Sequence, residues 1–94
     1  MSSEEAAKKK RRAAFLQGVQ DQLDNPKTPE VRFHYQRLRS LGHSDSNARE
    51  LIATLLAFFV WHTFRGDGYT YADYVADLER LPQIDWDERD EVDA

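Results

Sequence analysis

The chain contains no cysteine, and it has only four glycines and three prolines among 94 residues. The lack of cysteine excludes disulfides, cysteine nucleophiles and thiolate metal sites, and it is consistent with a cytoplasmic location. Histidine is also scarce, and His34, His43 and His62 form no HxxxH or HExxH pair. No carboxylate pair, nucleophile elbow or glycine-rich phosphate loop indicates catalysis. We therefore expect no metal, no cofactor and no catalytic residue.

Long hydrophobic runs are almost absent as well. The exception is LIATLLAFFVWHTF, residues 51–64, which carries no charge in a chain that is 32% charged. Fourteen residues fall short of the roughly 20 that a helix needs to cross a bilayer. The short apolar stretch after Arg12 is likewise too brief for a signal peptide. We interpret residues 51–64 as a buried core helix and expect no membrane association.

The formal net charge of −4 hides a strong separation of charge along the chain. Residues 1–12 carry +3, residues 83–94 carry −5, and the segment between them carries −2. A chain of this length has room for one core. We therefore expect a helical domain over residues 13–82, a basic N-terminal extension over residues 1–12 and an acidic C-terminal tail over residues 83–94.

Hydrophobic periodicity predicts an all-α fold, a small bundle of about four helices at about residues 4–24, 28–41, 44–65 and 70–81. Thr28 and Ser44 are the expected N-caps of the second and third helices. Thr70 and Asp73 have the spacing of a capping box at the start of the fourth. Gly66 or Gly68 is expected to end the third helix.

Each predicted helix except the third has one inward stripe. The stripes are Phe15, Leu16, Val19 and Leu23; then Val31, His34, Tyr35, Leu38 and Leu41; then Tyr71, Tyr74, Val75, Leu78 and Leu81. Asp77 is expected to face outward. The third helix is apolar on nearly every side, and three narrow stripes do not suffice to cover such a helix. This mismatch is our main reason to predict a protein partner or a homodimer.

Several residues are candidates for that contact. Phe33 and Trp86 fit no inward stripe, and Phe33 lies beside Arg37 on the opposite face of its helix. Exposed aromatic residues next to arginine often mark interfaces, although single exposed aromatics also occur without a role. Ala53 and Ala57 form a strip of small residues that would let another helix approach closely. The favoured function is a non-enzymatic helical protein–protein interaction module.

Two alternatives remain open. The basic run Lys8, Lys9, Lys10, Arg11 and Arg12 could neutralise phosphates, which would make the protein a nucleic-acid-associated accessory factor. A solvated helix extension explains the same run more simply, since no second basic face accompanies it. His62, close to Tyr69, Tyr71 and Tyr74, could instead centre a small-ligand site or an enzyme. A buried, neutral, hydrogen-bonded core histidine, with a tyrosine as one candidate partner, is the favoured interpretation of His62.

Residues 25–82 also show a resemblance at the level of pattern. It rests on NPKTPEV, on the turn RLRSLGHS, on the helix NARELIATLLAFFVWHTF and on the ending LERLP. Together these elements resemble a small all-helical bacterial protein of an uncharacterised domain-of-unknown-function type. The resemblance implies a helical cytosolic module with no known activity, so it assigns no functional residue.

Overall fold

The computed structural model describes residues 3–84, and within that range every regular element is an α-helix. The helices are α1 (Ser3–Asp24), α2 (Pro29–Ser40), α3 (Asp45–Arg65) and α4 (Tyr71–Arg80). The all-α fold and the four predicted helices are therefore confirmed. Among these helices, none is both long and apolar enough to cross a membrane.

Local signals set most of the helix ends. Ser44 caps α3, because its side chain accepts a hydrogen bond from the backbone N–H of Asn47 at 3.0 Å. Thr70 and Asp73 form the complete capping box at the start of α4. Gly66 ends α3 with a φ of 69°, a left-handed conformation in which glycine carries no side-chain penalty.

Thr28 corrects one expectation. It occupies the N-cap position of α2, but its side chain makes no capping hydrogen bond. Its hydroxyl instead donates to the backbone oxygen of Gln22 at 2.9 Å. The turn between α1 and α2 brings that carbonyl within reach, and the hydroxyl ties the two helices together. Pro29 begins the helix as predicted, because its ring fixes φ at a helical value.

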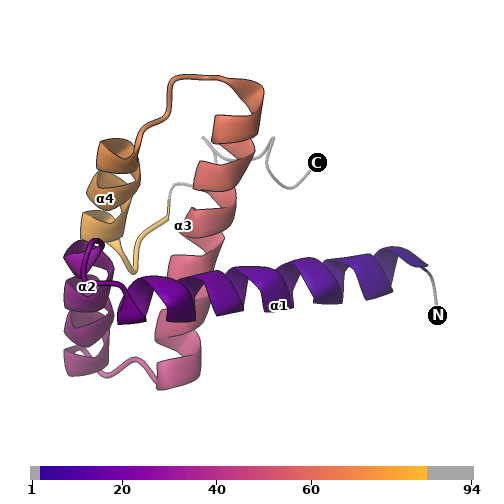
Figure 1. Cartoon of the computed structure of the whole chain (residues 1–94). Coiled ribbons are helices and arrows are strands. Elements are labelled where there is room, and N and C mark those ends of the chain that lie inside the picture. The colour runs from indigo at the N-terminus through magenta and orange to yellow at the C-terminus, as the bar shows by residue number, and fades with distance from the viewer. Residues whose placement is uncertain (1–2, 85–94) are drawn as a thin grey trace.

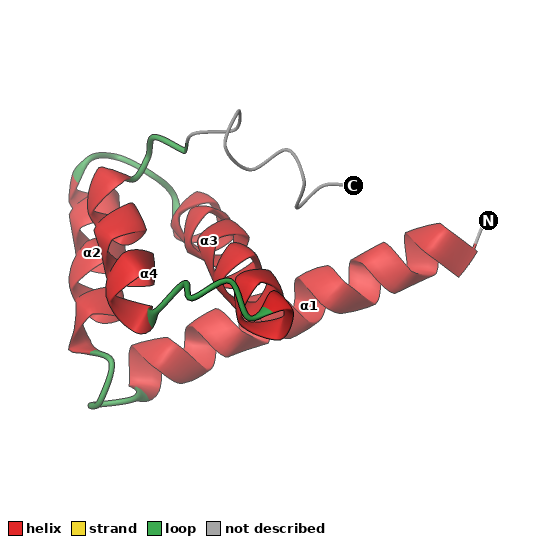
Figure 2. Cartoon of the chain, turned by 90° about the horizontal axis from the view of Figure 1, so that it is seen from above, coloured by secondary structure: helices red, strands yellow, loops and turns green. Residues whose placement is uncertain are grey.

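The core forms around α3, which packs against α1, α2 and α4 (Figure 1). In both ribbon views α2 and α4 lie on one side of α3, and α1 crosses α3 (Figure 2). The fully buried side chains with the largest volumes come from all four helices and the residue after α4: Val19, Val31, Leu38, Ile52, Leu55, Tyr74, Leu78 and Leu81. Every predicted stripe thus contributes to one core.

Two residues, Leu41 and Asp77, face the opposite way from their prediction. Leu41 was expected to be buried but is 61% exposed, because α2 ends at Ser40 and Leu41 turns out as its C-cap. Asp77 was expected to face solvent but is only 5% exposed. Its carboxylate accepts hydrogen bonds from the hydroxyl of Tyr69 and from Arg80, the latter at 2.7 Å. These partners offset the cost of burying the charge.

The first half of α1 projects beyond the rest of the molecule (Figures 1 and 2). The crossing with α3 is close at Gly18, where an added Cβ would lie 2.9 Å from Cδ2 of Leu56. Val19 and Leu23, which follow this point, are buried, and the residues from Lys8 to Ala14 are exposed. The helix therefore docks with its second half and extends its basic first half into solvent.

Candidate interaction surfaces

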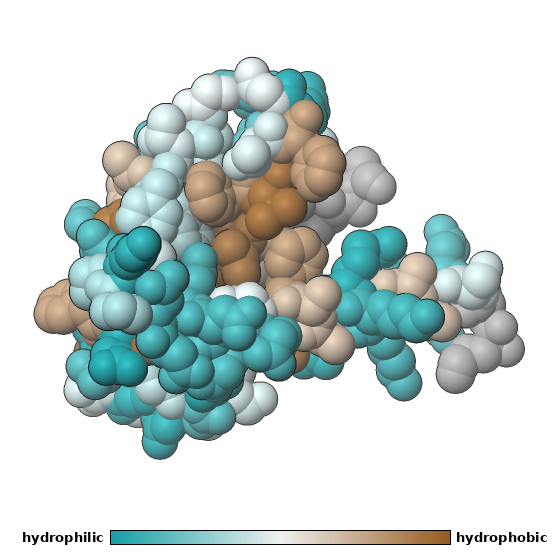
Figure 3. All heavy atoms as spheres, viewed as in Figure 1, coloured by the Kyte–Doolittle hydropathy of each residue, from teal (hydrophilic) through white to brown (hydrophobic). Residues whose placement is uncertain are grey.

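One face of α3 passes from buried to exposed along its length. Ala53, Ala57, Val60 and Phe64 are spaced by four, three and four residues, so they lie in one row. Ala53 is 7% exposed, Ala57 and Val60 are half-buried, and Phe64 is 89% exposed. Figure 3 shows hydrophobic surface gathered between α1 and the α3–α4 connection. We call Ala57, Val60 and Phe64 the α3 row.

The α3 row keeps exposed surface because α1 crosses α3 before the row begins. The close contact of Gly18 with Leu56 places the crossing near the middle of α3. Ala53 lies before that point and is buried within the chain, so it offers no contact to a partner. Ala57 lies beyond it and keeps part of its surface. The predicted pair of alanines is therefore divided between the core and the surface.

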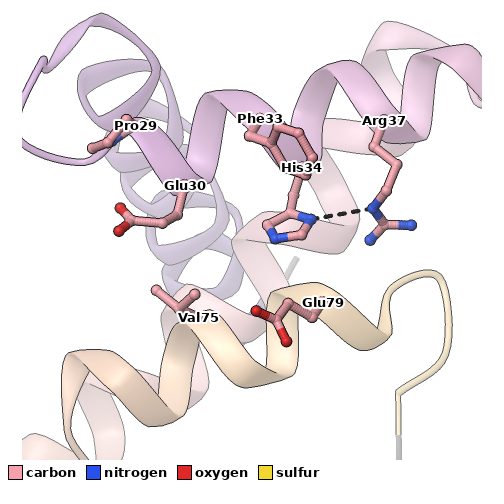
Figure 4. A pocket seen from close by; sticks show the side chains of 7 residues that line it. All are labelled: Pro29, Glu30, Phe33, His34, Arg37, Val75 and Glu79. Carbon is pink, nitrogen blue, oxygen red and sulfur yellow. Dashed lines mark hydrogen bonds between the residues drawn. The ribbon is translucent and has the colours of Figure 1, made fainter.

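A second surface is an open groove between α2 and α4 with a volume of about 580 Å³ (Figure 4). Its lining consists of Pro29, Glu30, Phe33, His34, Arg37, Val75 and Glu79. Phe33 is 62% exposed, and the edge-to-face contact between its ring and that of His34 has centroids 5.0 Å apart. The two residues singled out on this helix, Phe33 and Arg37, thus meet at one groove.

Arg37 faces inward, although the sequence placed it beside Phe33 on the outer face. Its Nη2 donates to the backbone oxygen of Leu78 at 3.0 Å, which joins α2 to α4. Its Nε donates to Nδ1 of His34 at 3.1 Å. Since Nδ1 accepts a hydrogen bond, the proton of the neutral imidazole lies on Nε2. Burial and the neighbouring guanidinium lower the pKa of His34, so the ring is neutral near pH 7.

The basic run lies on the projecting half of α1. Lys8, Lys9, Lys10, Arg11 and Arg12 are all exposed. Arg12 forms an ion pair with Glu50 of α3, in which its Nε donates to Oε2 at 3.2 Å. Five consecutive residues of an α-helix point in every direction around its axis. We call residues 8–12 the cationic arm.

His62 belongs to a cluster at the end of α3. Its Nδ1 lies 2.8 Å from Oδ2 of Asp67, and its ring stacks on Tyr69 with centroids 5.3 Å apart. The hydrogen-bond partner is thus an aspartate from the turn, while the tyrosine contributes a ring face. Nε2 is inaccessible to solvent and has no hydrogen-bond partner among the described residues. A substrate cannot reach that nitrogen, so this geometry favours a structural role for the histidine.

Other predicted residues fall outside these surfaces. Trp86 and the acidic tail from residue 85 onward lie outside the described residues. Within residues 3–84, no three carboxylate or imidazole side chains gather as a metal site would require. Sequence reasoning missed Glu30, Val75 and Glu79 as parts of the groove. No local signal could have identified them, because the groove exists only once α2 and α4 have packed together.

Comparison of the chain with protein-family models, with curated proteins and with solved structures finds no match. The resemblance to a domain-of-unknown-function type therefore stays a prediction.

Proposed function

We propose that this chain is a non-enzymatic helical interaction module, and that it self-associates through the α3 row. The observation that supports this most is Phe64, a large aromatic residue near the end of α3 with 89% of its surface exposed. Exposed apolar side chains in a continuous row are typical of contact sites, whereas scattered ones are not. Charged residues are absent from the row itself.

A second copy is a suitable partner because the row is complementary to itself. From Ala57 to Phe64 it extends about 10 Å along the helix axis. Two copies related by a two-fold axis would place Phe64 of one against the small Ala57 of the other. Such a contact is smaller than the roughly 800 Å² that each partner buries in a standard interface. We therefore expect a weak dimer whose population depends on protein concentration.

Sedimentation analysis over a range of concentrations tests this proposal. The weight-average mass should rise from 11.0 kDa toward twice that value as concentration increases. Phe64→Ala should weaken dimerisation by about tenfold or more, because burying one phenylalanine contributes about 1.5–3 kcal/mol. Since Phe64 is exposed, the variant should keep the stability of the parent chain.

Leu41→Ala is the matched control, because Leu41 is also a large exposed apolar residue but lies at the end of α2. It should leave the dimer unchanged. A mass that stays at the monomer value at every concentration would refute self-association. Equal weakening by both substitutions would show that general stickiness, and not the α3 row, brings the copies together.

A further inference from the structure

The groove between α2 and α4 has the side chains that a cationic group requires. Glu30 comes from α2 and Glu79 from α4, so the two carboxylates line the groove from facing helices (Figure 4). Oε1 of Glu30 accepts a hydrogen bond from the hydroxyl of Tyr71 at 2.9 Å, which leaves its second oxygen available. Glu79 forms no hydrogen bond or ion pair with any residue between 3 and 84. The groove thus offers acceptors that the chain itself does not fully use.

Phe33 adds a second feature that suits a cation. Its exposed ring stands at the edge of the groove, and Val75 and Pro29 supply further apolar surface. A lysine or arginine lays its methylene stem along such surface while its charged head stays near solvent and carboxylates. Cations also bind the face of an aromatic ring. The combination of ring, apolar floor and carboxylates therefore favours a basic side chain.

Arg37 does not oppose such a ligand. Its guanidinium is held by two hydrogen bonds within the protein, from Nη2 to the backbone oxygen of Leu78 and from Nε to His34. By formal charge, Glu30 and Glu79 contribute −2, Arg37 contributes +1 and a neutral His34 contributes nothing, so the lining carries a net charge of −1. Its charge therefore has the sign that a basic segment complements.

We propose that this groove binds the cationic arm of a second copy of the chain. The arm is the basic segment that the described structure leaves exposed and projecting, and residues 1–12 carry +3. It cannot reach the groove of its own chain, because α1 ends beside α2 and runs away from it over 22 residues, about 33 Å. The contact is separate from the α3 row, so either proposal can fail while the other holds.

The test uses a fluorescein-labelled peptide of residues 3–14, SEEAAKKKRRAA, titrated with the full-length chain and followed by anisotropy. Saturable binding is expected, and it should weaken as salt is raised because the contact is between exposed charges. Glu79→Gln and Phe33→Ala should each weaken binding about two- to fivefold, and the double variant about tenfold. A peptide in which all five basic residues are glutamine should not bind.

Two matched controls locate the contact. Asp21→Asn removes an exposed carboxylate from α1, and Leu41→Ala removes an exposed apolar side chain outside the groove. Neither should change the affinity of the peptide. Binding that is unaffected by Glu79→Gln and Phe33→Ala would overturn the proposal, as would binding of the glutamine peptide with equal affinity. An arm that binds duplex DNA but not this protein would also overturn it and assign the arm to nucleic acid.

Discussion

Thr70 and Asp73 form a capping box at the start of α4, and its contribution to stability can be measured. The hydroxyl oxygen of Thr70 accepts a hydrogen bond from the backbone N–H of Asp73 at 3.4 Å, and the N–H of Thr70 donates to Oδ2 of Asp73 at 2.8 Å. The helix that follows has ten residues, fewer than the 12 or so at which an isolated helix becomes even marginal in water. It therefore depends on its cap as well as on packing.

Thr70→Ala removes half of the capping box. Replacing a threonine N-cap by alanine costs about 1 kcal/mol of the free energy of unfolding. In a domain of this size such a loss lowers Tm by roughly 4–8 °C. The hydrogen bonds from Thr70 hold the pKa of Asp73 below its usual value, so at pH 7 its carboxylate is ionised and the capping box is complete. Thermal unfolding followed by circular dichroism at pH 7 measures the effect.

Thr63→Ala provides the control with the same chemical change. Thr63 lies inside α3, where its hydroxyl donates to the backbone oxygen of Phe59 at 2.8 Å, and it caps nothing. Alanine is the better helix former at such a position. We expect its free energy of unfolding to change by less than about 0.5 kcal/mol. If the two variants unfold at the same temperature, the capping box does not stabilise α4 as argued.

Three further predictions follow from other contacts. Burial lowers the pKa of His34, so the folded chain binds fewer protons than the unfolded chain just below pH 6.5. The free energy of unfolding should therefore fall as the pH drops below 6.5. Urea titrations at pH 5 to 7 measure this dependence, and His34→Gln should reduce it. Thr28→Asp should lower Tm, because a carboxylate cannot donate to the backbone oxygen of Gln22, whereas a true N-cap would tolerate it. Gly18→Ala should destabilise the chain by about 1 kcal/mol, because the added Cβ would lie too close to Cδ2 of Leu56. In a Leu56→Ala background that clash is gone, and the same change should stabilise the chain by up to about 1 kcal/mol because alanine is the better helix former.

The fold was predictable where local chemistry decides it. The ends of α3 and α4 depend on Ser44, on the pair Thr70 and Asp73, and on Gly66, each of which acts within a few residues of itself. Thr28 shows the limit of that reasoning, because its hydroxyl donates a hydrogen bond to the backbone oxygen of Gln22 on the preceding helix instead of capping α2. A cap and a tertiary hydrogen bond require the same residue type, and the sequence alone does not distinguish them.

The candidate sites were predictable only in part. Phe33 stood out because it broke the stripe of its helix, and it does lie exposed beside a groove. The opposite wall of that groove, with Glu79, comes from a helix more than 40 residues later in the chain. The prediction that Asp77 faces outward was wrong for the same reason, because its burial depends on a hydrogen bond from the hydroxyl of Tyr69, which lies in the turn before α4. Patterns within one helix contain no information about such pairings.

The exposure of the α3 row follows from the division of α1 into two unlike halves. The second half carries a buried stripe that includes Val19 and Leu23, and it crosses α3 near Leu56. The first half carries five consecutive cations, and placing them on the apolar surface around Val60 would cost their hydration without offering any acceptor in return. The arm therefore extends into solvent, and it does not cover the α3 row. One sequence feature, the change within α1 from a cationic segment to one with a buried apolar stripe, thus accounts for both the α3 row and the projecting cationic arm, the two surfaces that we propose meet other copies of the chain.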